Sequence, residues 1–192
     1  MAMAKKYEFK PDKPRSGFLA KLFLTPTQRR ALLKWALYAL VLVVLAVVQD
    51  VLLSRVHLFG ATSELVPCGI FLICIVEGIE RGSIFALISS LVYLFSGTAA
   101  GNYSVVFITV LACLVTALRQ AFLQKGFPAA LVCTAIAMLV YELLTFAIGV
   151  FLGLTLWSRL GIFCLTALLS MVAIPVLYPI ILSIGGGDTW KE

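Results

Sequence analysis

The sequence predicts an all-α, polytopic integral membrane protein with about six transmembrane helices and both ends in the cytoplasm. Of its 192 residues, 62% are hydrophobic and only 12% are charged. A soluble fold of this length could not bury so much apolar surface. The cations are also clustered, because nine of the 15 Lys and Arg residues lie within the first 34 positions. This distribution is typical of a cytoplasmic anchor on anionic lipid rather than of a nucleic-acid-binding surface.

Three segments are expected. Residues 1–32 form a basic cytoplasmic tail, and apolar residues at helical spacing over 17–24 indicate a short helix on the inner membrane surface. The tail lacks the apolar core of a cleavable signal peptide. Residues 33–184 form the six-helix transmembrane domain, and 185–192 form a cytoplasmic C-terminal tail.

The first span is predicted over 33–53. The segment Thr25–Gln28 indicates its start, with Thr at the N-cap, Pro at the first helical position and Gln three residues after the cap. Trp35 and Tyr38 would lie at the cytoplasmic interface. Asp50, near the outer end, is interpreted as a solvated carboxylate. Arg55 and His57 follow it closely and could meet it there.

The second and third spans depend on one interruption. The apolar run 66–76 is only eleven residues long, and a second run covers 83–95. A perpendicular span needs about twenty residues. We place a tight cytoplasmic turn at Glu77–Gly82 between two spans, and the alternative is one long helix over 66–95.

Charge bias distinguishes the two topologies. With six spans, thirteen Lys and Arg residues lie inside and two, Arg55 and Arg159, lie outside. With five spans the ratio falls to ten against four, and Arg81 is left within the bilayer. The positive-inside rule therefore favours six spans. The remaining spans are then expected at about 103–118, 129–152 and 160–182. Pro175 and Pro179 should kink or end the last of them.

Ionisable residues at membrane depth need an explanation because each costs about 2.5 to 3.5 kcal/mol on insertion scales. Glu77 and Arg81 are four residues apart, with Glu80 beside them, so the group could neutralise itself at the inner interface. A structural turn is favoured over a proton relay. Glu142 lies about fourteen residues into its span. It is either protonated or paired across helices, for example with Arg119 or Arg81, and serves either internal packing or partner contact.

No catalytic or metal-binding pattern is evident. The five cysteines lie in or beside apolar runs without a CxxC spacing, and His57 is the single histidine. No GxSxG motif or phosphate-binding glycine loop is present. We therefore expect no enzymatic activity, no cofactor and no metal.

An ordered set of residues between Gln49 and Glu142 matches a known family. The matching positions are Gln49, Phe59-Gly60, Leu65-Val66-Pro67, Glu77-Gly78, Arg81-Gly82, Ser96-Gly97-Thr98-Ala99-Ala100-Gly101, Leu118-Arg119 and Tyr141-Glu142. In this pattern the segment 60–144 resembles MreD, the small membrane subunit of the bacterial rod-shape, or elongasome, complex. Many relatives have an Asp three residues before the start of the glycine-containing turn, and in this chain Tyr93 stands at about that place.

The resemblance implies a protein of the bacterial cytoplasmic membrane with no reaction of its own and no small-molecule substrate. It would bind MreC and help to link cytoplasmic MreB filaments to the peptidoglycan-synthesis enzymes, RodA and its transpeptidase partner. The candidate partner-contact or structural residues are Glu77, Arg81, Gly97, Gly101, Arg119 and Glu142.

A second class of protein has similar length, helix number and a basic start. It is the substrate-binding S component of an energy-coupling-factor vitamin transporter. Such subunits usually show small residues four apart in the first span, and Ala36, Ala39 and Ala46 do not have that spacing. The sequence therefore favours the rod-shape interpretation.

Overall fold

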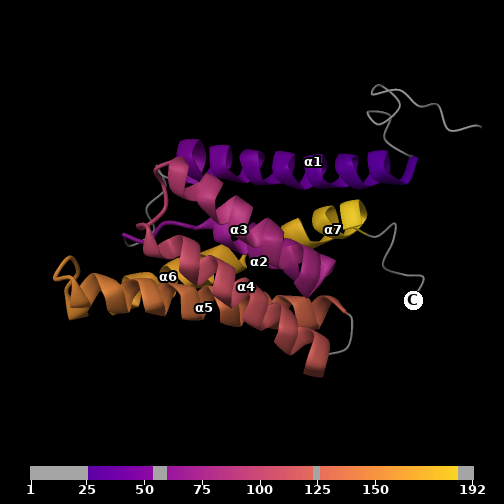
Figure 1. The fold of residues 1–192 in the computed structure, drawn as a ribbon. Helices are drawn as coiled ribbons and strands as arrows, with labels where there is room; N and C mark the ends of the chain where they lie inside the picture. The colour runs from indigo at the N-terminus through magenta and orange to yellow at the C-terminus, as the bar shows by residue number, and fades with distance from the viewer. Residues whose placement is uncertain (1–25, 54–59, 123–125, 186–192) are drawn as a thin grey trace, which may run out of the picture. The chain divides into compact units, whose positions relative to one another are not determined.

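The computed structural model describes residues 26–53, 60–122 and 126–185, and within them the chain is helical with no strands. It divides into two compact units, Met1–Leu33 and Lys34–Glu192, and the second holds the bundle. The predicted all-α class is confirmed. The elements (Figure 1) are α1 Pro26–Val47, the π-helical turn Val48–Leu52, α2 Leu65–Glu77, α3 Ile79–Phe95, α4 Tyr103–Phe122, α5 Phe127–Phe151, the 3-10 turn Trp157–Arg159, α6 Leu160–Met171 and α7 Ile174–Gly185.

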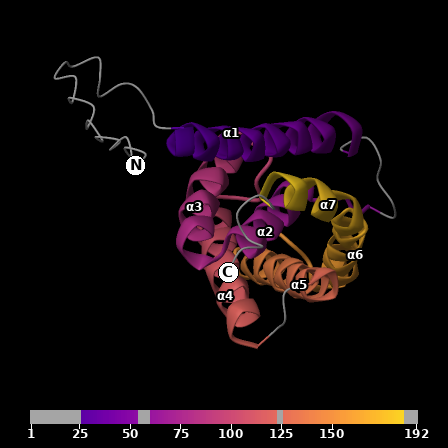
Figure 2. The same cartoon turned by 90° about the vertical axis from the view of Figure 1, so that its right-hand side faces the viewer.

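Helix α2 is the centre of the bundle. Every residue from Leu65 to Ile75 is buried. Figure 2 shows α2 among α3, α4, α5 and α7. A helix that is apolar on all sides is stable only away from water, and α2, too short to cross a bilayer alone, is covered by the other helices.

The buried start of α2 is capped by side chains from other helices. Leu65 and Val66 donate their backbone N–H groups to Gln49 Oε1, at 2.8 and 3.1 Å. Glu64 donates its backbone N–H to Ser170 Oγ at 2.8 Å. The first amides of a helix have no partner within it, so a buried start without such caps would leave polar groups unsatisfied.

The predicted break between spans two and three is present but much shorter than expected. Helix α2 ends at Glu77 and α3 begins at Ile79, so Arg81 and Gly82 are helical and the turn is Gly78 alone. Gly78 has φ 89°, which a glycine adopts without strain. Because this residue reverses the chain by itself, the predicted turn over 77–82 is corrected. The alternative of one long helix over 66–95 is excluded.

Close packing of α3 on α2 also depends on Gly82. A Cβ atom at this position would lie 2.9 Å from Cys74 Cα. The Cys74 thiol donates to the Gly82 carbonyl at 3.1 Å. The missing side chain therefore lets the two backbones of the hairpin approach each other directly.

Within the Lys34–Glu192 unit, α1 to α5 alternate in direction, whereas α6 and α7 follow one another with a bend of 46°. Tyr38, in the middle of α1, bonds to Glu77 at the end of α2. The end of α7 lies there too, since a Cβ on Gly185 would be 2.6 Å from the Tyr38 hydroxyl. At the opposite end, Phe146 late in α5 packs against Trp157, before α6. We call these the Lys34 end, after Lys34 of α1, and the Gln49 end, after Gln49 of the π-helical turn that follows α1.

Among the described residues, three helices are long and apolar enough to cross a membrane, or four if a bent pair counts as one crossing. The three cover Gln28–Val51, Tyr103–Ala121 and Phe127–Phe151. The pair is α6 with α7, bent by 46°. Pro175 follows this bend and Pro179 stands inside α7, so the expected kink in the last predicted span is confirmed.

Helices α2 and α3 are shorter than a full crossing. They have 13 and 17 residues, or roughly 20 and 26 Å at 1.5 Å per residue. The hydrocarbon core of a bilayer is about 30 Å thick. The described helices thus include four elements of spanning length and composition, counting the bent pair once, and two shorter helices that complete the bundle.

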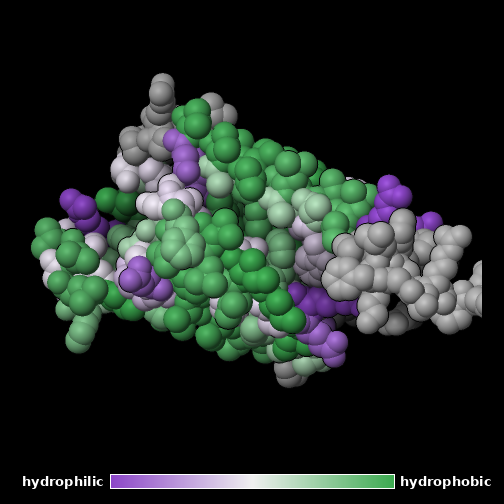
Figure 3. All heavy atoms as spheres, turned by 45° about the horizontal axis from the view of Figure 1, so that its top comes forward, coloured by the Kyte–Doolittle hydropathy of each residue, from purple (hydrophilic) through white to green (hydrophobic). Residues whose placement is uncertain are grey.

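Large apolar side chains cover much of the outer surface. Leu40, Val43 and Val44 on α1 are 58%, 54% and 53% exposed, and α3 and α4 carry similar residues. Figure 3 shows hydrophobic residues over most of the face that it draws. A soluble monomer rarely exposes an apolar area this continuous, so the surface fits a protein surrounded by lipid.

Substituting Gly82 with Ala should lower the thermal stability of the detergent-purified protein. The added Cβ would overlap the Cys74 backbone, and overpacking of this kind typically costs about 1–3 kcal/mol. Gly161→Ala is the matched control, because a Cβ at helical Gly161 meets nothing within 4 Å. Equal melting temperatures for the two variants would show that the α2–α3 contact is not tight.

Candidate functional site

The Lys34 end contains a buried ion pair. Lys34 Nζ lies 2.8 Å from Glu77 Oε1, and the two side chains are 13% and 2% exposed. Tyr38 donates its hydroxyl to the same oxygen at 2.6 Å. A buried carboxylate needs such partners, because the loss of its hydration is costly. These contacts join the start of the bundle's first helix to the end of its central one.

The spacing of Glu77 and Arg81 predicted that they would neutralise each other, but Glu77 pairs with Lys34 instead. Gly78 ends α2 between them, so the two residues do not share one helical face. Arg81 and Glu80 are exposed, and neither forms an ion pair within the described residues. Asp50 is exposed, as a solvated carboxylate would be, and Arg55 and His57 lie outside the described residues.

Arg119 lies at the Lys34 end as well. Its Nη1 donates to the Ile75 carbonyl in the last turn of α2, while its Nε is buried without a hydrogen-bond partner. A cation is favoured at this position because the last carbonyls of a helix carry partial negative charge. Glu142 lies instead beside a cavity lined by residues of the Gln49 end. The suggested pairing of Glu142 with Arg119 or Arg81 is thus not formed in the described structure.

Gly97 and Gly101 lie in the turn between α3 and α4 at the Gln49 end. Gly97 has φ 78°, and a Cβ there would meet nothing within 4 Å. A Cβ on Gly101 would lie 2.7 Å from the Tyr103 ring. Ser96 and Thr98 join their hydroxyls at 2.8 Å across the turn. The turn is therefore held by a side-chain hydrogen bond, and its first glycine, Gly97, is exposed.

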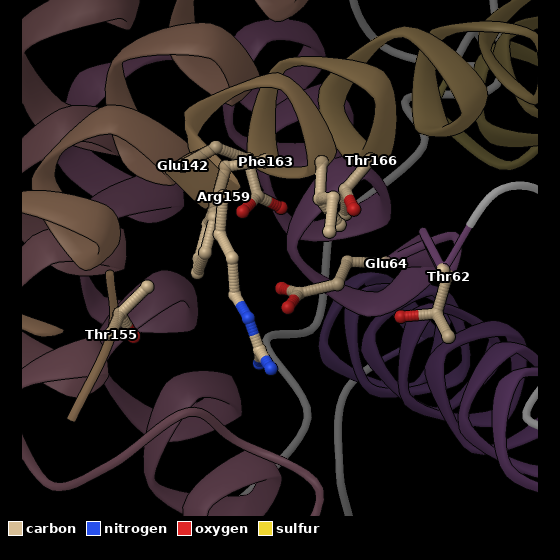
Figure 4. Close-up of a pocket in the computed structure, with 9 residues that line it drawn as sticks. Thr62, Glu64, Glu142, Thr155, Arg159, Phe163 and Thr166 are labelled. Carbon is tan, nitrogen blue, oxygen red and sulfur yellow. The ribbon is translucent and has the colours of Figure 1, made fainter. Parts of the chain in front are cut away.

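A polar cavity of about 250 Å³ opens at the Gln49 end. It is formed by the segment before α2, by α5 and by the start of α6. Figure 4 shows the carboxyl groups of Glu64 and Glu142 and the guanidinium of Arg159 pointing into the same space. We call this space the Glu142 cavity, and its lining residues are Gly60, Thr62, Glu64, Glu142, Thr155, Arg159, Ile162, Phe163 and Thr166.

Several polar groups at the Glu142 cavity have no protein partner. Glu142 is 2% exposed and its Oε1 makes no hydrogen bond. Oε2 of Glu64 is also buried without a partner. Arg159 forms no ion pair with either carboxyl group among the described residues. With so little of its surface exposed, Glu142 faces the cavity rather than the outside, which favours an internal role over direct partner contact.

The backbone of Glu64 is fixed by a hydrogen bond, whereas Oε2 of its side chain has no partner. The backbone N–H of Glu64 is fixed by Ser170, and the residue precedes α2. Burial raises the pKa of the Glu64 carboxyl above the ordinary value of 4.5. The carboxyl therefore keeps its proton to higher pH in the folded protein than in the unfolded chain.

Three of these residues have contacts that the sequence does not predict. Lys34 belongs to the N-terminal cations expected on anionic lipid, Arg159 is expected outside the membrane, and nothing in the sequence analysis singles out Glu64. For Glu64 a signal existed, since it is a carboxylate directly before an apolar run too short to span a bilayer. No sequence spacing links Glu64 to Glu142 or Lys34 to Glu77, because each pair is joined only by helix packing.

Comparisons with known proteins do not identify the chain. No protein-family model, no curated protein and no solved structure matches it.

Replacing Glu77 with Gln should destabilise the protein. The change leaves the Lys34 ammonium largely buried without its counter-charge, which costs about 3 kcal/mol, or less to the extent that Lys34 reaches water. A thermal melt in detergent measures the loss. Lys34→Met combined with Glu77→Gln should recover part of it, and Glu80→Gln, at an exposed site, should have little effect. A double variant less stable than Glu77→Gln alone would contradict the pairing.

The stability of the protein should fall as the pH rises from about 4.5 towards neutrality. In that interval the folded state holds a proton on Glu64 that the unfolded chain has released, so the free energy of unfolding decreases. Thermal melts at about pH 5 and about pH 7.5 measure the effect. Glu64→Gln cannot titrate and should show a smaller decrease. An identical decrease in both proteins would assign the pH dependence to other groups.

Proposed function

We propose that the protein is a non-enzymatic membrane subunit of the bacterial cell-shape complex, related to MreD. One observation carries the proposal most directly. Gly60, Gly78 and Gly97 have φ of 86°, 89° and 78°, where a side chain would be strained, and all three belong to the matching pattern. At these three positions the glycines of the pattern meet a backbone requirement of this bundle, which supports the resemblance.

Other matching residues also organise this bundle. Gln49 caps α2, and its Nε2 donates to the Tyr93 hydroxyl at 3.3 Å. Arg119 bonds to the end of α2. Two residues of the matching pattern, Gln49 and Arg119, thus hold the two ends of the central helix. A bundle built like that of MreD would need such contacts, and this supports the proposal. Tyr93 occupies the position where many relatives have an acid, and in this chain it serves as the partner of Gln49.

The proposal includes six membrane crossings with both ends in the cytoplasm. Helices α2 and α3 are short for a crossing, but α2 is enclosed by other helices and does not need to match the bilayer by itself. Lys34, Arg81 and Arg119 lie at the Lys34 end, and Arg159 lies at the Gln49 end. The positive-inside rule then assigns the Lys34 end to the cytoplasm.

In this orientation the Gly97 turn faces the outer side, where wall-synthesis enzymes act. The protein would pack beside MreC in the membrane and connect MreB filaments inside to RodA and its transpeptidase partner. The exposed apolar faces of α1, α3 and α4 offer surfaces for such neighbours as well as for lipid.

Depletion of the protein from a rod-shaped host should produce round cells that lyse. An affinity-tagged copy should restore rod shape and co-purify with MreC from detergent-solubilised membranes. Cell width and length by microscopy, and MreC recovery by immunoblot, are the measurements. Normal rods after complete depletion would contradict the proposal.

A matched pair of glycine variants tests whether the Gly97 turn contacts a partner. Gly97 and Gly153 have φ of 78° and 71°, and a Cβ at either meets nothing within 4 Å. Asn tolerates this conformation, so Gly97→Asn and Gly153→Asn add a side chain at similar backbone cost. We expect Gly97→Asn to reduce MreC recovery severalfold and Gly153→Asn to leave it unchanged. Equal MreC recovery with the two variants would show that the Gly97 turn does not contact MreC.

The Glu142 cavity favours a second candidate function, the S component of an energy-coupling-factor vitamin transporter. Small-ligand sites are usually concave, at about 300–1,000 Å³, with a few convergent polar groups. The cavity, at about 250 Å³, approaches this size. Loss of growth on a trace vitamin after depletion, together with normal cell shape, would support this candidate and reject the first.

A further inference from the structure

The Glu142 cavity brings together polar groups that the bundle does not satisfy. None of the hydroxyls of Thr62, Thr155 and Thr166 makes a side-chain hydrogen bond among the described residues. Oε1 of Glu142 and Oε2 of Glu64 are unpartnered as well. Buried polar atoms are nearly always paired in folded proteins, with water or a ligand where protein groups are absent. The cavity has room for about eight waters at roughly 30 Å³ each.

Water can satisfy the hydroxyls but cannot balance the charge. Two carboxyl groups and one guanidinium face the cavity, so the ionised site lacks one positive charge. Glu142 is 2% exposed and cannot turn towards bulk solvent. A buried carboxylate without a counter-ion is strongly disfavoured. The charges balance when one carboxyl group keeps its proton, as burial favours for Glu64, or when both are ionised and a monovalent cation binds beside the exposed Arg159.

The lining indicates which cation fits. Calcium takes six to eight oxygen ligands and zinc prefers nitrogen and sulfur, whereas the described residues contain no cluster of three or more His, Cys, Asp or Glu. A primary ammonium has three N–H donors, which suit carboxylate and hydroxyl oxygens. Ile162 and Phe163 form an apolar wall for a short carbon stem, and the Phe163 ring can attract a cation at its face.

We propose that the Glu142 cavity binds a small primary amine, with its ammonium held between Glu142, Glu64 and the threonine hydroxyls and its stem against Ile162 and Phe163. This site is independent of the cell-shape proposal. It is a property of the bundle itself, and it does not require a partner protein.

The test uses the full-length protein in phosphatidylcholine nanodiscs and isothermal titration calorimetry with n-butylammonium. We expect saturable binding. n-Butanol, which keeps the stem but has no charge, and butyltrimethylammonium, which has the charge but no N–H donors, should each bind at least tenfold more weakly. Sodium, potassium and calcium ions should not compete at equal concentration.

Two variants separate a binding role from damage to the fold. Glu142→Gln should weaken butylammonium binding at least tenfold. Arg159→Gln removes the competing cation and should leave binding equal or tighter. Glu80→Gln, on the exposed surface of α3, is the control and should bind like the parent protein. Because damage to the bundle would weaken binding in both cavity variants, the proposal requires weaker binding in Glu142→Gln together with equal or tighter binding in Arg159→Gln.

Several outcomes would overturn the site. No saturable heat with butylammonium, or equal affinity for butanol, would show that the cavity does not recognise an ammonium. Competition by calcium would assign it to a metal ion. These results do not affect the cell-shape proposal, whose readouts are cell morphology and MreC recovery.

Discussion

The rest of the bundle depends on the hydrogen bonds that the first amides of α2 donate to Gln49, because they fix the start of the central helix. Helix α2 is buried from Leu65 to Ile75, so neither water nor headgroups can pair the start of its backbone. Gln49, at the end of the first helix, accepts two of these N–H groups, and Ser170 accepts a third from Glu64. The ends of α1 and α6 are therefore fixed where α2 begins.

The opposite end of α2 is held in a related way but by charge. The Glu77 carboxylate bonds Lys34 and Tyr38, and Arg119 bonds the carbonyl of Ile75. A helix of 13 residues thus has polar contacts with other helices at both ends. This arrangement explains how a run too short for an independent crossing can still be part of a membrane bundle, because its ends meet protein groups rather than the bilayer interface.

The two ends of the bundle differ in how their charges are satisfied. At the Lys34 end the carboxylate has its cation and a hydroxyl donor, which makes the group structural. At the Gln49 end the carboxyl groups of Glu64 and Glu142 and the guanidinium of Arg159 share a cavity without forming an ion pair among the described residues. Unsatisfied buried groups beside a cavity are more typical of a binding site than of packing.

The sequence by itself determined the helical class, most helix positions, the break near Gly78 and the bend near Pro175, because these follow from local apolar runs, glycine conformation and proline geometry. It could not determine which carboxylate meets which cation. Glu77 is four residues from Arg81, yet it pairs with Lys34, 43 positions away, since Gly78 turns the chain before the helical spacing can apply. Likewise, only tertiary packing brings Glu64 beside Glu142, because no local periodicity relates residues on different helices.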